Sequence, residues 1–137
     1  CALSQQRDRN TYVKDEIGNA IMQKIYSITS YVHSHYNDEL SLDFIAKEFY
    51  ISPYYLSHQF KSITGFTLTE YIQMTRIRHA QQLLIYSRQK ISLIAEQCGF
   101  NSFSQFNRVF NKLSSMSPSE FRKQQAASNT ASTMLSY

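Results

Sequence analysis

Glycine, proline and cysteine are scarce in this chain. Its 137 residues contain three Gly, two Pro, two Cys and no Trp. Turn-rich all-β folds and low-complexity sequences need many more Gly and Pro residues, so we exclude both classes. Two cysteines cannot build a disulfide framework, and we expect Cys98, which lies in an apolar stretch, to be a small core residue. Because nothing requires an oxidising compartment, we predict a cytoplasmic protein.

Long hydrophobic runs are also missing. No segment approaches the roughly 18 apolar residues that a membrane-spanning helix needs, so we expect no membrane partner. The first seven residues lack the basic and then apolar order of a signal peptide. The chain does not begin with Met, and we therefore expect it to be the C-terminal piece of a longer protein.

Charged residues are moderate in number but unevenly distributed. Hydrophobic residues make up 42% of the chain and charged residues 18%, which suits a folded core rather than a disordered chain. Residues 1–60 carry five Lys or Arg and seven Asp or Glu, whereas residues 61–137 carry nine and three. A basic C-terminal half is typical of proteins that bind a polyanion such as nucleic acid. A solvated surface with a chance asymmetry explains the charge equally well.

The hydrophobic pattern predicts about seven helices and no strand, which is an all-α fold. Residues 1–16 show no clear period and are expected to be a linker or a disordered end. From Ile17 onward, apolar residues recur every three or four positions, as on one face of a helix that ends near Tyr36.

N-cap residues mark the helices that follow. Ser41 precedes a short helix, and Ser52 precedes a helix with Pro at its first position that should stop at Gly65. Thr67 opens a capping box and, with it, a long helix that ends near Tyr86.

The same signals return in the second half of the chain. A short helix is predicted to end at Gly99, and Asn101 or Ser102 can cap the helix after it. Residues 117–120 form another capping box with Pro at the first helical position, which starts a last short helix. The Ser-, Ala- and Thr-rich residues 125–137 are expected to be a disordered tail.

The two halves of the chain are copies of one unit. Ile45-Ala46 matches Ile94-Ala95 at an offset of 49 residues. Five further pairs match at an offset of 50: Phe60 with Phe110, Gly65 with Ser115, Thr67 with Ser117, Glu70 with Glu120, and Tyr71 with Phe121. Each copy has two short helices joined by a turn, which is a helix-turn-helix unit. The sequence therefore predicts two such units joined by the long helix.

The second helix of each unit, here called its recognition helix, is narrow enough to enter a DNA major groove. The residues expected to face inward are Leu56, Phe60 and Ile63 in the first recognition helix, and Phe106, Phe110 and Leu113 in the second. The separate outer stripes comprise Tyr54, Ser57, His58 and Lys61 in the first, and Ser104, Asn107, Arg108 and Asn111 in the second. A solvated face usually mixes Glu with Lys, so stripes without acids favour DNA contact.

Several stretches resemble the AraC/XylS family of bacterial transcription regulators. In the second copy, residues 94–110 and 116–122 look like the family's signature. The first copy resembles the family's first helix-turn-helix from Leu40 to Ile72, and residues 76–84 are similar to its connecting helix. The resemblance covers about residues 18–124.

The resemblance implies two helix-turn-helix subdomains, residues 17–86 including the linker helix and residues 87–124, with recognition helices in successive major grooves of double-stranded DNA. The base contacts that it implies are Tyr54, Ser57, His58, Phe103, Ser104, Gln105, Asn107 and Arg108. Phosphate contacts are expected from Lys61, Asn111 and Lys112. Regulators of this family often carry a sensor domain, which we expect to precede this chain and to be absent from it. RNA polymerase is a further candidate partner.

The chain departs from the family pattern at a few positions. Ser115 stands where the family usually has Gly, so that turn needs another way to reach a positive φ, or is looser. Tyr50 likewise replaces a Gly of the first turn. Asn111 replaces a common Lys, which weakens one phosphate contact.

Alternatives stay open for several of these residues. Arg108 can read a guanine, or it can contact a phosphate or pair with Glu120. Tyr54 can pack on a neighbouring helix, and Phe103 fits the core or a thymine methyl group better than a hydrogen bond. The rival function is a helical protein-interaction domain that binds an acidic protein partner.

Catalysis and metal binding find no support in the sequence. No nucleophile with a base, no phosphate-binding loop and no dinucleotide fingerprint occurs, so we expect no enzyme and no cofactor. His33 and His35 lie two residues apart on a predicted helix and therefore point in different directions. We expect no metal site.

Overall fold

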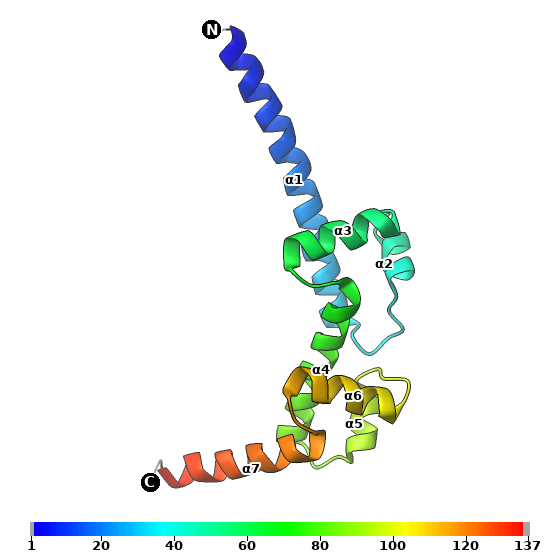
Figure 1. The fold of residues 1–137 in the computed structure, drawn as a ribbon, viewed down its shortest axis with the longest axis vertical. Helices are drawn as coiled ribbons and strands as arrows, with labels where there is room; N and C mark the ends of the chain where they lie inside the picture. Colours follow the sequence, from blue (N-terminus) through cyan, green and yellow to red (C-terminus); the bar gives the residue numbers. More distant parts are fainter. Residues whose placement is uncertain (1, 136–137) are drawn as a thin grey trace. The chain divides into compact units, whose positions relative to one another are not determined.

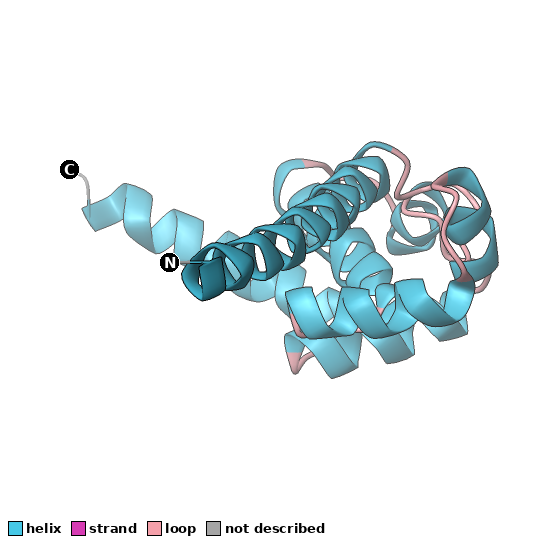
Figure 2. Cartoon of the chain, turned by 90° about the horizontal axis from the view of Figure 1, so that it is seen from above, coloured by secondary structure: helices cyan, strands magenta, loops and turns pink. Residues whose placement is uncertain are grey.

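The computed structural model describes the backbone of residues 2–135 and the side chains of residues 18–126. Over the described backbone the chain forms seven helices and no strand, as predicted (Figures 1 and 2). The helices are α1 (Ala2–Ser34), α2 (Leu42–Glu48), α3 (Pro53–Thr64), α4 (Leu68–Tyr86), α5 (Ile91–Gln97), α6 (Phe103–Ser114) and α7 (Pro118–Leu135). None of them, within the described residues, has the length and apolar character to cross a lipid bilayer.

The chain divides into two compact units. Unit 1 contains Cys1–Ser34 and Leu40–Thr69, and unit 2 contains His35–Glu39 and Glu70–Tyr137. The sequence predicted a later boundary, at residues 86 and 87, with all of the linker helix in the first subdomain. The division falls earlier because α4 contributes Ile77, Ala80 and Leu84 to the hydrophobic core of unit 2.

Helices α1 and α7 are longer than the sequence predicted. Helix α1 begins at Ala2 rather than near Ile17, and α7 continues to Leu135. The side chains of residues 1–17 and 127–137 lie outside the described part of the chain, so a role as linker or tail for these segments stays a prediction.

In unit 1, α3 packs against both α1 and α2 (Figure 1). The buried apolar residues of these three helices are Ile25, Ile28, Val32, Ile45, Ala46, Leu56 and Phe60. The ring of Phe49, which follows α2, meets the ring of Tyr31 edge-on, with centroids 5.8 Å apart. The core therefore holds α2 and α3, the two helices of the first helix-turn-helix, on the second half of α1.

In unit 2, α6 packs against α5 and α7 (Figure 1). Phe106 lies at the centre, with ring centroids 5.2 Å from Phe100 and 5.6 Å from Phe110. Phe110 in turn meets Phe121 of α7 at 5.5 Å. Cys98 is fully buried, as predicted, and burial raises the pKa of its thiol to about 11, although the Arg76 guanidinium acts to lower it.

One expected core residue of α6 is on the surface. Leu113 is 42% exposed, whereas Val109 is buried beside Phe106 and Phe110. The prediction for Leu113 was wrong because the buried stripe of α6 runs through positions 106, 109 and 110, and Leu113 lies in the last turn at the edge of the core.

Both units use left-handed backbone at two equivalent places. In the turn between the two short helices, Tyr50 has φ 55° in unit 1 and Gly99 has φ 95° in unit 2. At the end of the recognition helix, Gly65 has φ 84° in unit 1 and Ser115 has φ 60° in unit 2. The chain therefore keeps the left-handed geometry in both copies, and in each copy one position carries a side chain.

Two arginines of unit 2 donate hydrogen bonds to backbone carbonyls near helix ends. Arg76 of α4 donates from Nε to the carbonyl of Tyr36 at 2.7 Å and from Nη2 to that of Asp38 at 2.8 Å. The Tyr36 ring also stacks on His79, with centroids 3.8 Å apart. Arg122 of α7 donates to two carbonyls at the end of α4, those of Leu84 and Ser87, at 3.1 and 3.2 Å.

Candidate nucleic-acid interface

The first recognition helix, α3, is defined by strong signals at both ends. The Ser52 hydroxyl accepts the backbone N–H of Tyr55 at 3.2 Å, and Pro53 occupies the first helical position. At the other end Gly65 donates its N–H to the Lys61 carbonyl at 2.8 Å. Burial of Leu56 and Phe60 fixes which face of α3 points inward.

The outer face of α3 carries the predicted stripe. Tyr54 is 74% exposed, and His58 and Lys61 are also exposed, while Ser57 is half-buried. The Tyr54 and His58 rings lie 4.1 Å apart between centroids, and His58 Nδ1 is 3.0 Å from the Tyr54 carbonyl oxygen. Tyr54 thus packs along its own helix rather than being covered by a neighbouring helix.

A shallow hollow lies on this face of α3. Its lining residues are Ser57, His58, Lys61 and Ser62. Hydroxyl and ammonium groups can hydrogen-bond to bases or phosphates, and an imidazole can hydrogen-bond to bases. Ser62 was missed by the sequence reasoning, although its spacing of four residues from His58 was a signal for a shared face.

The second recognition helix, α6, is built in the same way. The Ser102 hydroxyl accepts the N–H of Gln105 at 3.1 Å, which confirms the predicted N-cap. Ser115 ends the helix and donates its N–H to the Asn111 carbonyl at 2.9 Å. At the same end of α6, the Gln81 side chain of α4 donates an amide N–H to the Ser114 hydroxyl at 2.9 Å. This hydrogen bond anchors the end of α6 to α4.

The outer face of α6 presents the remaining candidates. Ser104, Arg108 and Lys112 are exposed, and Gln105 and Asn107 are half-buried. Two of the candidates, Phe103 and Asn111, have contacts within the protein that limit their contacts with a ligand. Phe103 is 48% exposed, with its ring centroid 6.2 Å from that of Phe106. The Asn111 amide donates to the Asn107 carbonyl at 2.7 Å, so part of its hydrogen-bonding capacity is used inside the helix.

Arg108 has no ion-pair partner within residues 18–126, where side chains are described. The Glu120 carboxylate instead accepts the N–H of Ser117 at 3.4 Å, and the Ser117 hydroxyl accepts the N–H of Glu120 at 3.2 Å. This reciprocal pair is the predicted capping box of α7. The alternative in which Glu120 neutralises Arg108 is therefore not observed, and the guanidinium is available to a ligand.

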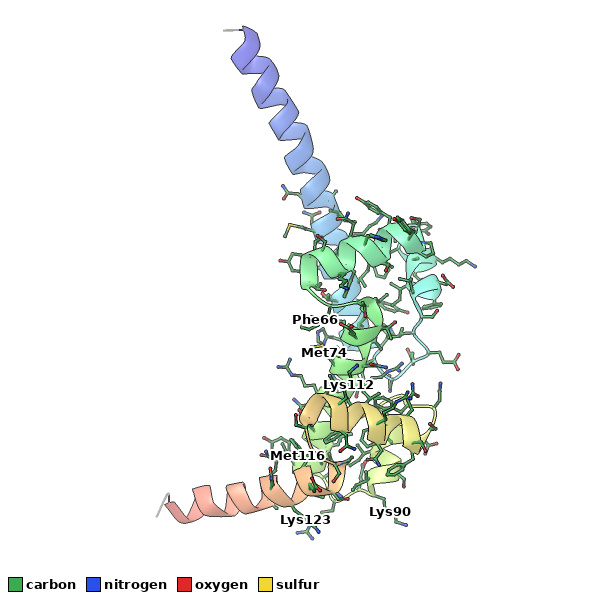
Figure 3. The ribbon with its side chains drawn as sticks, viewed as in Figure 1. Phe66, Met74, Lys90, Lys112, Met116 and Lys123 are labelled. Carbon is green, nitrogen blue, oxygen red and sulfur yellow. The ribbon has the colours of Figure 1, made fainter. Side chains whose placement is uncertain are left out.

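The electrostatic character of both outer faces is positive or neutral. Neither α3 nor α6 contains an Asp or Glu residue. Figure 3 places Lys112 beside α6, and Lys90 and Lys123 at the opposite edge of unit 2. The helix α6 therefore contributes no negative charge of its own to this face.

Comparison with known proteins identifies relatives of the chain. A model of the helix-turn-helix domain family matches residues 45–124. YijO of Escherichia coli K12, an uncharacterized HTH-type transcriptional regulator, is 39% identical over 98 residues, which cover 72% of this chain and 35% of YijO. The transcriptional activator RhaR of Salmonella dublin is 33% identical over 116 residues, which cover 83% of this chain and 41% of RhaR. The chain thus spans less than half the length of these relatives.

Solved structures agree with the sequence relatives. A transcriptional regulator from Chromobacterium violaceum, described as having an AraC-type DNA-binding domain, superposes with a TM-score of 0.72 at 28% identity. The match covers 79% of this chain and 96% of that chain. The similarity therefore extends through both helix-turn-helix units rather than one of them.

Proposed function

The chain belongs to the AraC/XylS family of helix-turn-helix transcription regulators, and on this premise we propose that α3 and α6 bind double-stranded DNA in a sequence-specific manner. The observation that carries the proposal is the pair of exposed, acid-free faces on the two recognition helices. Positive charge for a polyanionic ligand comes from Lys61 on α3 and from Arg108 on α6, which has no ion-pair partner among residues 18–126.

The proposal places each recognition helix in a major groove. That groove is about 12 Å wide, and a helix with its side chains is about 10–12 Å across. Two units of the same construction suit two grooves, and successive major grooves recur about every 34 Å along one face of the duplex. We propose that α3 and α6 enter two successive grooves.

Different residues are proposed for base and phosphate contacts. Base contacts are assigned to Tyr54, Ser57, His58, Phe103, Ser104, Gln105, Asn107 and Arg108. Of these, Arg108 is the strongest candidate, since a guanidinium can pair with two acceptors of guanine. Phosphate contacts are assigned to Lys61, Asn111 and Lys112, where the two lysines contribute charge. The Asn111 contact is expected to be the weakest, because its amide already binds Asn107.

Selection from a random pool of DNA duplexes tests this function. We expect the chain to enrich a defined sequence, and its affinity for that sequence to fall steeply as salt rises, because bound Lys and Arg side chains release counterions. Failure to enrich any sequence would reject the proposal. Preferential binding to an acidic protein instead of DNA would favour the rival function.

The roles of a longer protein are proposals as well. We propose a sensor domain on the N-terminal side of this chain, a cytoplasmic location, and RNA polymerase as a further partner. These proposals rest on family membership alone. The match covers 35% of YijO and 41% of RhaR, so it does not extend to the rest of either relative. The described residues are assigned no catalytic role.

A further inference from the structure

The imidazole of His58 is held in one orientation on α3. Its Nδ1 lies 3.0 Å from the carbonyl oxygen of Tyr54, one turn earlier in the helix. Its ring packs on the Tyr54 ring at a centroid separation of 4.1 Å and an interplanar angle of 36°. Two independent contacts with Tyr54 therefore fix the ring, while the His58 side chain stays exposed.

The contact with Tyr54 decides which ring nitrogen carries the proton. A carbonyl oxygen can only accept a hydrogen bond, so Nδ1 of His58 must be the donor. In neutral imidazole the other nitrogen, Nε2, then has a free lone pair and acts only as an acceptor. A phosphate oxygen is also only an acceptor, so neutral His58 in this orientation cannot hydrogen-bond to the DNA backbone.

The edges of the bases offer Nε2 a defined set of partners. In the major groove adenine presents its N6 amino group and cytosine its N4 amino group as donors. Guanine and thymine present acceptors there, namely O6 and N7 of guanine and O4 of thymine. An acceptor on the protein therefore distinguishes the amino bases, adenine and cytosine, from the keto bases at one position of one strand.

We propose that His58 is a specificity-determining residue that accepts a hydrogen bond from the amino group of an adenine or cytosine. The inference rests on the proposed function, since it requires α3 to lie in a major groove. Lys61 and Ser62, which line the same hollow, can donate to backbone phosphates and so hold α3 in register. The contacts with Tyr54 hold the His58 imidazole in the orientation that leaves Nε2 as the acceptor.

The experiment compares sequence selection by the chain with that by two variants. His58→Ala removes the acceptor, and His58→Lys replaces it with a group that only donates. We expect the chain to select adenine or cytosine at one position, His58→Ala to lose that preference, and His58→Lys to shift it to guanine or thymine. Gln82→Ala, at an exposed position of α4, is the control that should keep every preference.

A base analogue lacking the amino group at that position provides the sharper test. We expect removal of the amino group to weaken binding by the chain about fivefold, which is typical of one net hydrogen bond. The same removal should leave binding by His58→Ala unchanged, because the two changes delete one interaction. Circular dichroism of each variant confirms that the helices are retained.

Three results would overturn the inference. The chain could select guanine or thymine at the position affected by His58→Ala, or no position could change, or the amino group could matter equally without His58. In each case the chain still selects a sequence, so the proposed function survives. If the chain selects no sequence at all, the proposed function fails and this inference fails with it.

Discussion

Four of residues 2–135, whose backbone the structure describes, adopt a left-handed conformation, and in two of them it carries a steric cost. Gly65 and Gly99 reach positive φ freely, whereas Tyr50 and Ser115 have a Cβ atom that crowds the backbone there. Tyr50 is 91% exposed, so its side chain gains almost no burial in return. The sequence identified Tyr50 and Ser115 as departures from glycine, but only the structure shows that both keep the left-handed conformation.

Replacing Ser115 with glycine should stabilise the chain. Ser115→Gly relieves the strain of a left-handed serine and is expected to raise the free energy of unfolding by about 1 kcal/mol. Tyr50→Gly should act in the same direction. Urea denaturation followed by circular dichroism measures both effects, and a loss of stability in Ser115→Gly would contradict the strain argument.

Replacing Gly99 with alanine should have the opposite effect. A Cβ at Gly99 would lie 2.9 Å from the Cα of Asn37, and φ is 95° there. We expect Gly99→Ala to lower the free energy of unfolding by more than about 2 kcal/mol.

Two other glycines separate strain from crowding in the same urea assay. Gly65 has a φ of 84°, and a Cβ added there would meet no atom within 4 Å. Gly65→Ala should therefore lower the free energy of unfolding less than Gly99→Ala does. Gly18 lies in α1, and a Cβ added there would meet no atom within 4 Å. Gly18→Ala should raise the free energy of unfolding by about 0.5–1 kcal/mol. Equal losses at Gly65 and Gly99 would show that contact with Asn37 is unimportant.

Arg108 and Lys112 allow the base and phosphate roles on α6 to be compared. Arg108→Ala should relax base preference at one position and weaken the selected site by about 1–3 kcal/mol. Lys112→Ala should weaken binding to all sequences alike and lower the salt dependence by about one counterion. Affinities for the selected site and for an unrelated duplex, each measured over a salt series, distinguish the two. An equal loss on both duplexes in Arg108→Ala would contradict its role in base reading.

At the scale of elements, local signals predicted most of the helices. Ser41, Ser52 and Ser102 accept the backbone bonds expected of N-caps, because capping depends on residues only a few positions apart. The hydrogen bonds donated by Arg76 and Arg122 could not be predicted, since each joins a side chain to a carbonyl 35 to 40 residues away. A backbone carbonyl has no sequence signature, so only the fold reveals these pairs.

Arg122 should therefore matter for the stability of unit 2. Its guanidinium donates to the carbonyls of Leu84 and Ser87, where α4 ends, and a lysine cannot reproduce both bonds. We expect Arg122→Lys to lower the free energy of unfolding by about 2 kcal/mol. Lys123→Ala, at the exposed neighbouring position, is the matched control and should change it little. Thermal unfolding of the two variants shows whether Arg122 stabilises unit 2 through these hydrogen bonds or is only a surface charge.

At the scale of the whole molecule, the repeat in the sequence corresponds to two units that each expose one recognition helix. Each unit has its own buried apolar residues and its own capped helices, as the repeat predicted. The base contacts themselves stay predictions, because a hydrogen-bonding surface residue has the same pattern in the sequence whether it faces water or DNA.

The two units should read separate parts of one binding site. If α3 and α6 enter successive major grooves, the base positions altered by His58→Ala and by Arg108→Ala form two blocks about 10–10.5 base pairs apart. Sequence selection by each single variant maps its block, and the double variant should lose both. Inserting five base pairs between the blocks turns them to opposite faces of the duplex, so binding should fall sharply. Blocks that coincide, or binding that tolerates the insertion, would contradict the two-groove arrangement.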